Sequence, residues 1–118
     1  MTKLSELIHH EFRDYEIIRS VPHSEVTHFT SSHKYTIAHH AGGEVLITDT
    51  LKRLLNEDTN FVRIHRSTIV RRELLKSIVR YPYEDDRDVL LTNGTLLKIS
   101  RRHNKTTLQY CKENEAKP

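Results

Sequence analysis

The sequence predicts a single, mostly β domain with two or three short helices. A chain of 118 residues is long enough to bury one modest core, and 36% hydrophobic with 30% charged residues suits a small soluble globule. Short β-prone runs recur along the chain and are separated by turn-forming residues. The strongest local signal is Asn93-Gly94 between two such runs, because this pair is preferred in two-residue type I′ hairpin turns.

The first half of the chain carries two helical signals among several strand signals. Apolar residues at helical spacing over residues 3–13 indicate a lead-in amphipathic helix. A second short helix is expected after Asp49, its predicted N-cap, and its leucines share one apolar face. The expected strands of this half cover residues 15–21, 26–30, 35–40 and 44–48.

The second half predicts further strands and a weak helix. "FVRIH" indicates a strand over residues 61–65, and another strand is expected from about Leu75 to Tyr81. "DVLLTNGTLLKIS" supplies the two arms of the predicted hairpin, and "RRHNKTTLQYCKE" has a weak helical pattern. We divide the chain into residues 1–20 (lead-in helix or linker and first strand), a domain over 21–110, and a frayed tail over 111–118.

Positive charge is concentrated between residues 61 and 105. The net charge of the chain is +3, but this region holds eleven Lys or Arg against five acids, and Arg outnumbers Lys eight to three. Four of the five acids lie together in "YPYEDDRD", which is expected to be an exposed loop. Such clustering indicates a polyanionic partner, and Arg is suited to bidentate contacts with phosphate and guanine.

Catalytic and metal-binding patterns find little support. The nine histidines include the adjacent pairs His9-His10 and His39-His40, but there is no His-Glu-x-x-His, so scattered surface or turn histidines are expected. Cys111 is a single cysteine in a polar segment, and three glycines build no phosphate-binding loop. We therefore expect no enzymatic activity, no cofactor and no metal site. No segment has the composition of a membrane span or signal peptide, so a cytoplasmic location is the expectation.

Three expected loops carry short polar or cationic groups. They are Ser31-Ser32-His33-Lys34, Arg66-Ser67 and Ser100-Arg101-Arg102. Side chains of these types donate hydrogen bonds to phosphates and base edges. Aromatic residues are only 7% and tryptophan is absent, which favours groove recognition in a duplex over base stacking on a single strand.

The segments "LITDTLKRLLNEDTNFVRIHRSTIVRRELLKSI" and "DVLLTNGTLLKISRR" resemble the LytTR DNA-binding domain, which is typically the C-terminal half of bacterial response regulators. The resemblance covers about residues 21–105. The matching positions are Lys34-Tyr35, Thr50-Leu51-Lys52, Phe61, Arg63, His65-Arg66-Ser67, Ile78 and Ser100-Arg101-Arg102. It implies short antiparallel sheets with small helices, and recognition of promoter DNA from loops that enter two successive major grooves.

The resemblance also implies roles for individual residues. Base-reading positions fall at Lys34 or its neighbour His33, at Arg66 and at Arg101. Phosphate contacts fall at Ser67, Ser100, Arg102 and Lys105. His65 is expected either as a hydrogen-bonded scaffold residue or as a DNA contact.

The expected partner is duplex promoter DNA with repeated half-sites, which would accommodate a homodimer. A receiver domain or sensor kinase would be a further partner if the chain is a domain of a longer protein. Two other functions remain open, namely an RNA-binding module and a His-rich metal-sensing or protein-interaction domain.

Overall fold

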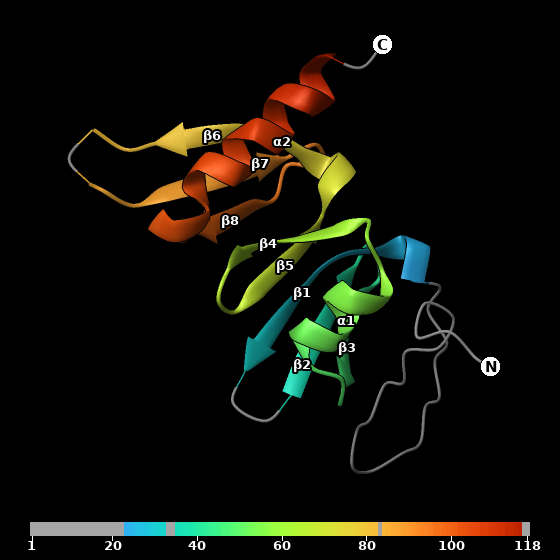
Figure 1. Ribbon diagram of the computed structural model, residues 1–118. Helices are drawn as coiled ribbons and strands as arrows, with labels where there is room; N and C mark the ends of the chain where they lie inside the picture. Colours follow the sequence, from blue (N-terminus) through green and yellow to red (C-terminus); the bar gives the residue numbers. More distant parts are fainter. Residues whose placement is uncertain (1–22, 33–34, 83, 117–118) are drawn as a thin grey trace.

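The computed structural model describes residues 23–32, 35–82 and 84–116, which form eight strands in two antiparallel sheets (Figure 1). The five-stranded sheet has the order β3-β2-β1-β5-β4, and the three-stranded sheet has the order β6-β7-β8. The strands are β1 Val26–Ser32, β2 Tyr35–His40, β3 Gly43–Ile47, β4 Phe61–His65, β5 Thr68–Arg71, β6 Leu75–Arg80, β7 Arg87–Leu91 and β8 Leu96–Ile99. The helices are α1 Leu51–Glu57 and α2 Asn104–Ala116, with the 3₁₀ turns η2 His23–Glu25, η3 Arg72–Leu74 and η4 Arg101–His103. This confirms the predicted fold class; the elements expected over residues 3–13 and 15–21 lie outside the described residues.

Two hydrophobic cores share the β4–β5 hairpin. One core lies between α1 and the five-stranded sheet and includes Phe29, Leu54 and Ile69. The other lies among the three-stranded sheet, α2 and the opposite face of the hairpin, and includes Ile64 and Val70. Figure 1 shows the hairpin between the two layers. Since side chains alternate between the faces of a strand, adjacent residues of β5 enter different cores.

Strand β5 was not predicted as a strand of its own. All four of its residues are buried, including Arg71, so the segment shows no alternation of apolar and polar positions. Arg71 is only 8% exposed, and its Nε donates to the Val26 carbonyl oxygen at 3.0 Å. Its guanidinium also lies 4.7 Å from the centre of the Phe61 ring. Part of the arginine excess is therefore structural.

The first turn of α1 begins one residue later than predicted. Thr50, not Asp49, is the N-cap, with extended backbone angles and a side-chain oxygen that accepts from the Arg53 backbone N–H at 3.1 Å. Asp49 instead forms an ion pair with Arg53 at 3.0 Å. Both residues satisfy the preference for a short polar side chain before a helix, so the sequence alone does not separate them.

The β7–β8 hairpin is confirmed, but its turn differs from the predicted type I′ turn. The Gly94 N–H donates to the Leu91 carbonyl oxygen at 2.9 Å, so Thr92 and Asn93 are the central pair of the turn, and Gly94 follows with φ +90°. A turn followed by a residue at positive φ is the usual three-residue hairpin loop. The Thr92 N–H donates to the Leu74 carbonyl oxygen at 2.9 Å, a tertiary contact that favours this loop.

Helix α2 continues through Ala116, where the sequence predicted a frayed tail. Cys111 is buried in the second core. The Asn114 side chain donates to the carbonyl oxygens of Arg72 and Leu75 at 2.7 and 2.8 Å. These contacts hold the last turns of the helix against the start of β6.

His28 departs from the expectation of surface histidines. It is 7% exposed, and its ring stacks on that of His39 with centroids 4.1 Å apart and planes within 3°. Its Nδ1 lies 2.7 Å from the Thr27 hydroxyl, while the His39 Nε2 lies 2.9 Å from the Thr30 hydroxyl. The pair is therefore part of the packed β1–β2 ladder.

Candidate nucleic-acid interface

Backbone hydrogen bonds join the end of β1, the β4–β5 hairpin and the residue that follows β8. The Ser31 N–H, at the end of β1, donates to the Ser67 carbonyl oxygen at 2.9 Å. The Ser100 N–H, just after β8, donates to the Ile64 carbonyl oxygen at 3.0 Å and links the two sheets. Three segments that are far apart in the sequence are thereby fixed side by side, with the β4–β5 turn in the middle.

The Arg63 side chain stabilises the backbone of the β4–β5 turn. The Arg63 Nη1 donates to the Arg66 carbonyl oxygen at 2.6 Å and makes a longer contact of 3.4 Å with the His65 carbonyl oxygen. The His65 Nδ1 accepts the Ser67 backbone N–H at 3.2 Å and lies 2.9 Å from the Ser67 hydroxyl. These contacts fix the backbone of the turn, while the Arg66 side chain at its tip is exposed.

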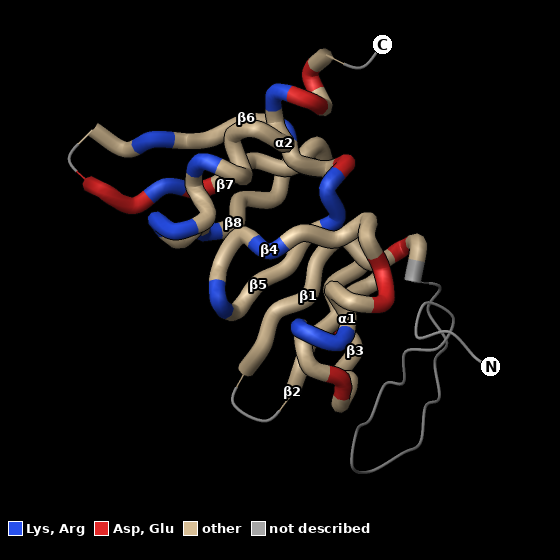
Figure 2. Tube along the Cα trace, viewed as in Figure 1, with Lys and Arg blue, Asp and Glu red and all other residues tan. Residues whose placement is uncertain are grey.

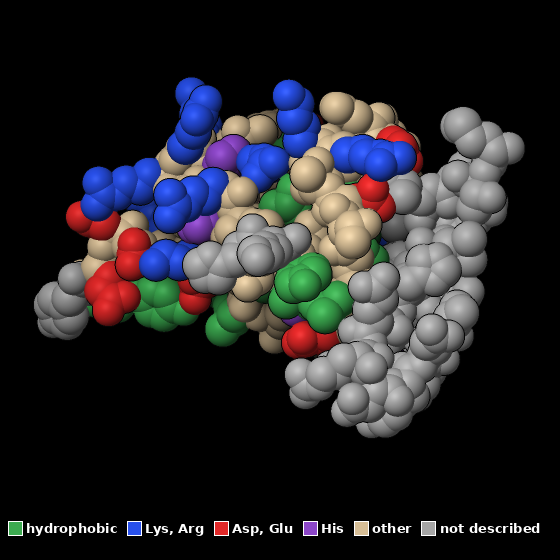
Figure 3. Space-filling view, turned by 90° about the horizontal axis from the view of Figure 1, so that it is seen from below, with side chains coloured by type: hydrophobic (Ala, Val, Ile, Leu, Met, Phe, Trp, Pro, Cys, Tyr) green, Lys and Arg blue, Asp and Glu red, His purple; other side chains and the backbone are tan. Residues whose placement is uncertain are grey.

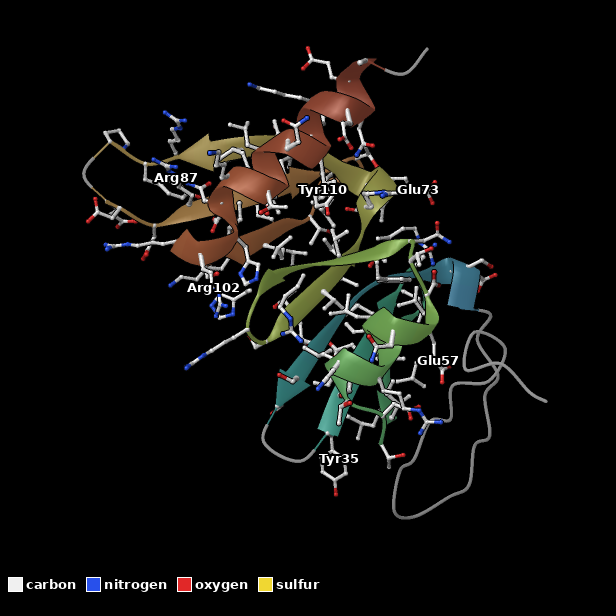
Figure 4. All side chains as sticks on the ribbon, viewed as in Figure 1. Tyr35, Glu57, Glu73, Arg87, Arg102 and Tyr110 are labelled. Carbon is white, nitrogen blue, oxygen red and sulfur yellow. The ribbon has the colours of Figure 1, made fainter. Side chains whose placement is uncertain are left out.

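The neighbouring loop begins as β8 ends and turns into η4. The Ser100 hydroxyl lies 2.7 Å from the His103 Nδ1, and the His103 N–H donates to the Ser100 carbonyl oxygen at 3.0 Å. Arg101 and Arg102 are both exposed. The Arg101 Nη2 donates to the Asp85 Oδ2 at 3.0 Å. Figure 4 shows Arg102 on the side of the second sheet that faces the β4–β5 turn.

Between these loops lies an open hollow of about 680 Å³. It is lined by Arg63, His65, Arg66, Ser100, Arg102 and His103. Lys and Arg side chains gather on one face of the molecule with histidines between them (Figure 3). Such a surface can bind an anion that runs across it, because its lining combines arginines with other hydrogen-bond donors.

The two histidines of the hollow are biased toward the neutral form. Burial, then the positive charges of Arg66 and Lys98, lower the pKa of His65. Burial, then Arg102, Arg63 and His65, lower the pKa of His103. Because the His65 Nδ1 accepts a backbone N–H, the proton of the neutral ring resides on Nε2. The His65 ring therefore offers a hydrogen-bond donor without adding a charge.

The structure brings together four of the predicted residues, namely Arg66, Ser67, Ser100 and Arg102. Arg101 is not among the residues that line this hollow, and Lys105 is exposed in the first turn of α2. His33 and Lys34 lie outside the described residues. Sequence reasoning missed Arg63 and His103, which contact the Arg66 carbonyl oxygen and the Ser100 hydroxyl within their own turns and line the hollow. His65 has the scaffold contact that was one of its two expected roles.

Metal-binding clusters and membrane-spanning helices are two other features that bear on function. Within residues 23–32, 35–82 and 84–116, no group of three or more His, Cys, Asp and Glu side chains is placed to hold a metal ion. No helix in this part of the chain is long and apolar enough to cross a membrane.

The fold and the basic loops define a small β domain that presents cations from loops. Residues 16–111 match the model of the LytTr DNA-binding domain family. The chain belongs to this family, which is one of DNA-binding domains and not of enzymes.

One curated protein and one solved structure illustrate what the chain is similar to. It is 41% identical over 88 residues to the positive alginate biosynthesis regulatory protein of Pseudomonas aeruginosa, a match that covers 73% of this chain. The chain spans only 36% of that relative's length. A solved LytTr DNA-binding domain from Bacillus cereus, of a protein described as a methyl-accepting/DNA response regulator, superimposes with a TM-score of 0.66 at 22% identity. That superposition covers 89% of this chain and 95% of the Bacillus domain, and it supports the fold.

Proposed function

We propose that this chain is a sequence-specific, duplex-DNA-binding regulator of transcription that reads promoter major grooves from its loops. The observation that carries the proposal is that the Ser31–Ser67 and Ser100–Ile64 backbone bonds hold the end of β1 and the residue after β8 against the β4–β5 hairpin. Membership of the LytTR family and the similarity to a regulatory protein support it. Binding as a homodimer to repeated half-sites is part of the proposal.

Base reading is assigned to Arg66 and Arg101, and to Lys34 or His33. Arg66 lies at the exposed tip of a turn whose backbone is held by Arg63, so its guanidinium has a fixed origin and a long reach. A guanidinium in that position can donate two hydrogen bonds to O6 and N7 of guanine. The phosphate contacts are assigned to Ser67, Ser100, Arg102 and Lys105, which lie beside the base readers or in the adjoining helix.

Arrangement of the loops favours duplex DNA over RNA. Side chains on loop tips can enter the wide major groove of B-form DNA, whereas the major groove of an RNA duplex is deep and narrow. Tyr35 is the one aromatic residue among the described residues whose side chain is about half exposed, so a platform for base stacking is lacking there. An RNA duplex of the same sequence is the appropriate competitor.

The first test selects bound duplexes from a random pool and then measures three variants against single-base changes in the selected site. We expect Arg66→Ala and Arg101→Ala each to lose about 1–3 kcal/mol at one preferred base and to relax the preference at that position. Lys105→Ala is the matched control, because it should weaken all duplexes about equally and lower the salt slope by about one unit.

Parallel, sequence-independent losses for all three variants would refute base reading and leave only electrostatic binding. Affinity that does not change over a several-fold range of salt would refute the electrostatic part as well. Stronger binding to the RNA duplex would replace the proposal with RNA recognition.

A further inference from the structure

Arg101 differs from the other exposed arginines of the basic face because it has an acidic partner. Its Nη2 donates to the Asp85 Oδ2 at 3.0 Å, although the two residues are 16 positions apart. Next to this pair, the Lys98 Nζ lies 3.5 Å from the Asp86 Oδ2. Within the described part of the chain, no acidic side chain forms an ion pair with Arg66 or Arg102.

The pairing follows from strand register. Arg87 lies opposite Ile99 and Asp88 lies opposite Lys98 in the β7–β8 ladder. The residues just before β7 must therefore lie beside the residues just after β8. Asp85 and Asp86 line the same small hollow as Arg101 and Asn104. Figure 2 shows the acidic segment before β7 next to basic segments of the second sheet.

Folding stability does not account for this contact. The Arg101 and Asp85 side chains are 80% and 85% exposed, and ion pairs between exposed groups contribute little to stability. The contact places a negative charge beside a guanidinium that is proposed to meet DNA. A carboxylate there attracts the same cation as a phosphate does, so it competes with non-specific phosphate binding.

The contact leaves base reading intact. Only one Nη2–H of Arg101 is used, and a guanidinium has five N–H donors. The remaining donors are enough for a two-bond contact with guanine. Asp85 therefore lowers the attraction of Arg101 for phosphates in general without removing its capacity to recognise a base.

From these observations we infer that Asp85 is a specificity-determining residue that acts through Arg101. It holds the guanidinium in position and weakens binding to non-specific DNA more than binding to the preferred site. The inference rests on the proposed function.

The test compares two duplexes, the selected site and a scrambled duplex of the same composition. Asp85→Asn keeps the side-chain shape and removes the charge. We expect affinity for the scrambled duplex to rise about 3- to 10-fold and its salt slope to steepen by about one unit, since a cation becomes available to phosphate. Affinity for the selected site should change by less than about 2-fold, so the ratio of the two affinities falls.

Glu84→Gln is the matched control. Glu84 is exposed, and this substitution removes the same charge from the same loop. It should leave the ratio of affinities unchanged. Arg101→Ala provides the second control: when Asp85→Asn is added to Arg101→Ala, the ratio should not change further. Equal rises for both duplexes, the same effect from Glu84→Gln, or a persistent effect in the Arg101→Ala background would each overturn the inference.

The outcomes also separate this inference from the proposed function. If the unaltered protein prefers its selected duplex and Asp85→Asn keeps the full preference, only the inference on Asp85 is overturned. If the unaltered protein does not distinguish the two duplexes, the proposed function fails, and the inference fails with it.

Discussion

The stacked pair His28–His39 should make folding sensitive to mild acid. His28 is buried in the β1–β2 ladder, and burial, together with the charge that His39 would carry, lowers the pKa of His28 to about 4. In the unfolded chain the ring recovers an ordinary pKa of about 6.5. The unfolded state therefore binds a proton more readily, and stability that is present above the unfolded pKa is lost as pH falls toward the folded pKa.

The size of this loss follows from the two pKa values. Between about pH 7.5 and about pH 5, the shift of His28 alone should lower the free energy of unfolding by about 2 kcal/mol. Burial also lowers the pKa of His39, partly opposed by Glu44, so this ring adds a loss of the same sign. Most carboxylates stay ionised between these pH values, so the change in the free energy of unfolding comes mainly from the histidines.

The assay is urea unfolding of the unaltered protein and of His28→Gln at both pH values. Glutamine keeps a polar side chain but does not titrate, so the variant should start less stable and lose about 2 kcal/mol less on acidification. NMR titration of the His28 ring in the unaltered protein gives an independent readout, with an expected midpoint near 4. A ring midpoint near the ordinary value, or the same pH dependence for both proteins, would refute the reasoning.

Two further predictions concern single contacts in the fold. Gly94→Val should destabilise the protein by roughly 1 kcal/mol or more, because Gly94 has φ +90° and a β-branched residue is strained there even though no atom lies within 4 Å of its added Cβ. An unchanged urea midpoint would show that residue 94 does not need positive φ. Asn114→Ala should cost about 1 kcal/mol, because two backbone carbonyl oxygens lose the donor that holds α2. Glu115→Ala, at the exposed neighbouring position, is its control, and equal midpoints for both variants would contradict a docking role for Asn114.

The sequence was informative wherever an element carries its own local signal. Short β-prone runs predicted β1, β2 and β4, and the leucines of α1 predicted a helix with one buried face. The hairpin followed from Asn93-Gly94, since turn residues report locally on chain reversal. Its turn type did not follow, because the Thr92–Leu74 contact that favours it comes from another part of the chain.

The exposure and contacts of individual arginines could not be predicted from such local signals. Arg63, Arg66 and Arg71 lie within nine residues of one another, yet the first braces a turn, the second is exposed and the third is buried. Whether an arginine is exposed or buried depends on the face of the strand that carries it and on the elements that pack against that face. The predicted polyanion-binding region therefore contains an arginine, Arg71, that serves the packing of the fold.

The two hydrophobic cores share the β4–β5 hairpin, and this explains how exposed loops can keep a defined spacing. Ile69 packs in one core and Val70 in the other, so tilting β5 would disturb the packing of both. The Ser100–Ile64 bond fixes the second loop to the same hairpin, and Arg63 fixes the backbone that carries Arg66. A partner would then order only the ends of the exposed side chains, while the distances between the loops are already set before binding. Because ordering lowers affinity, a scaffold of this kind would, on the proposed function, let a few loop residues supply specificity without a recognition helix.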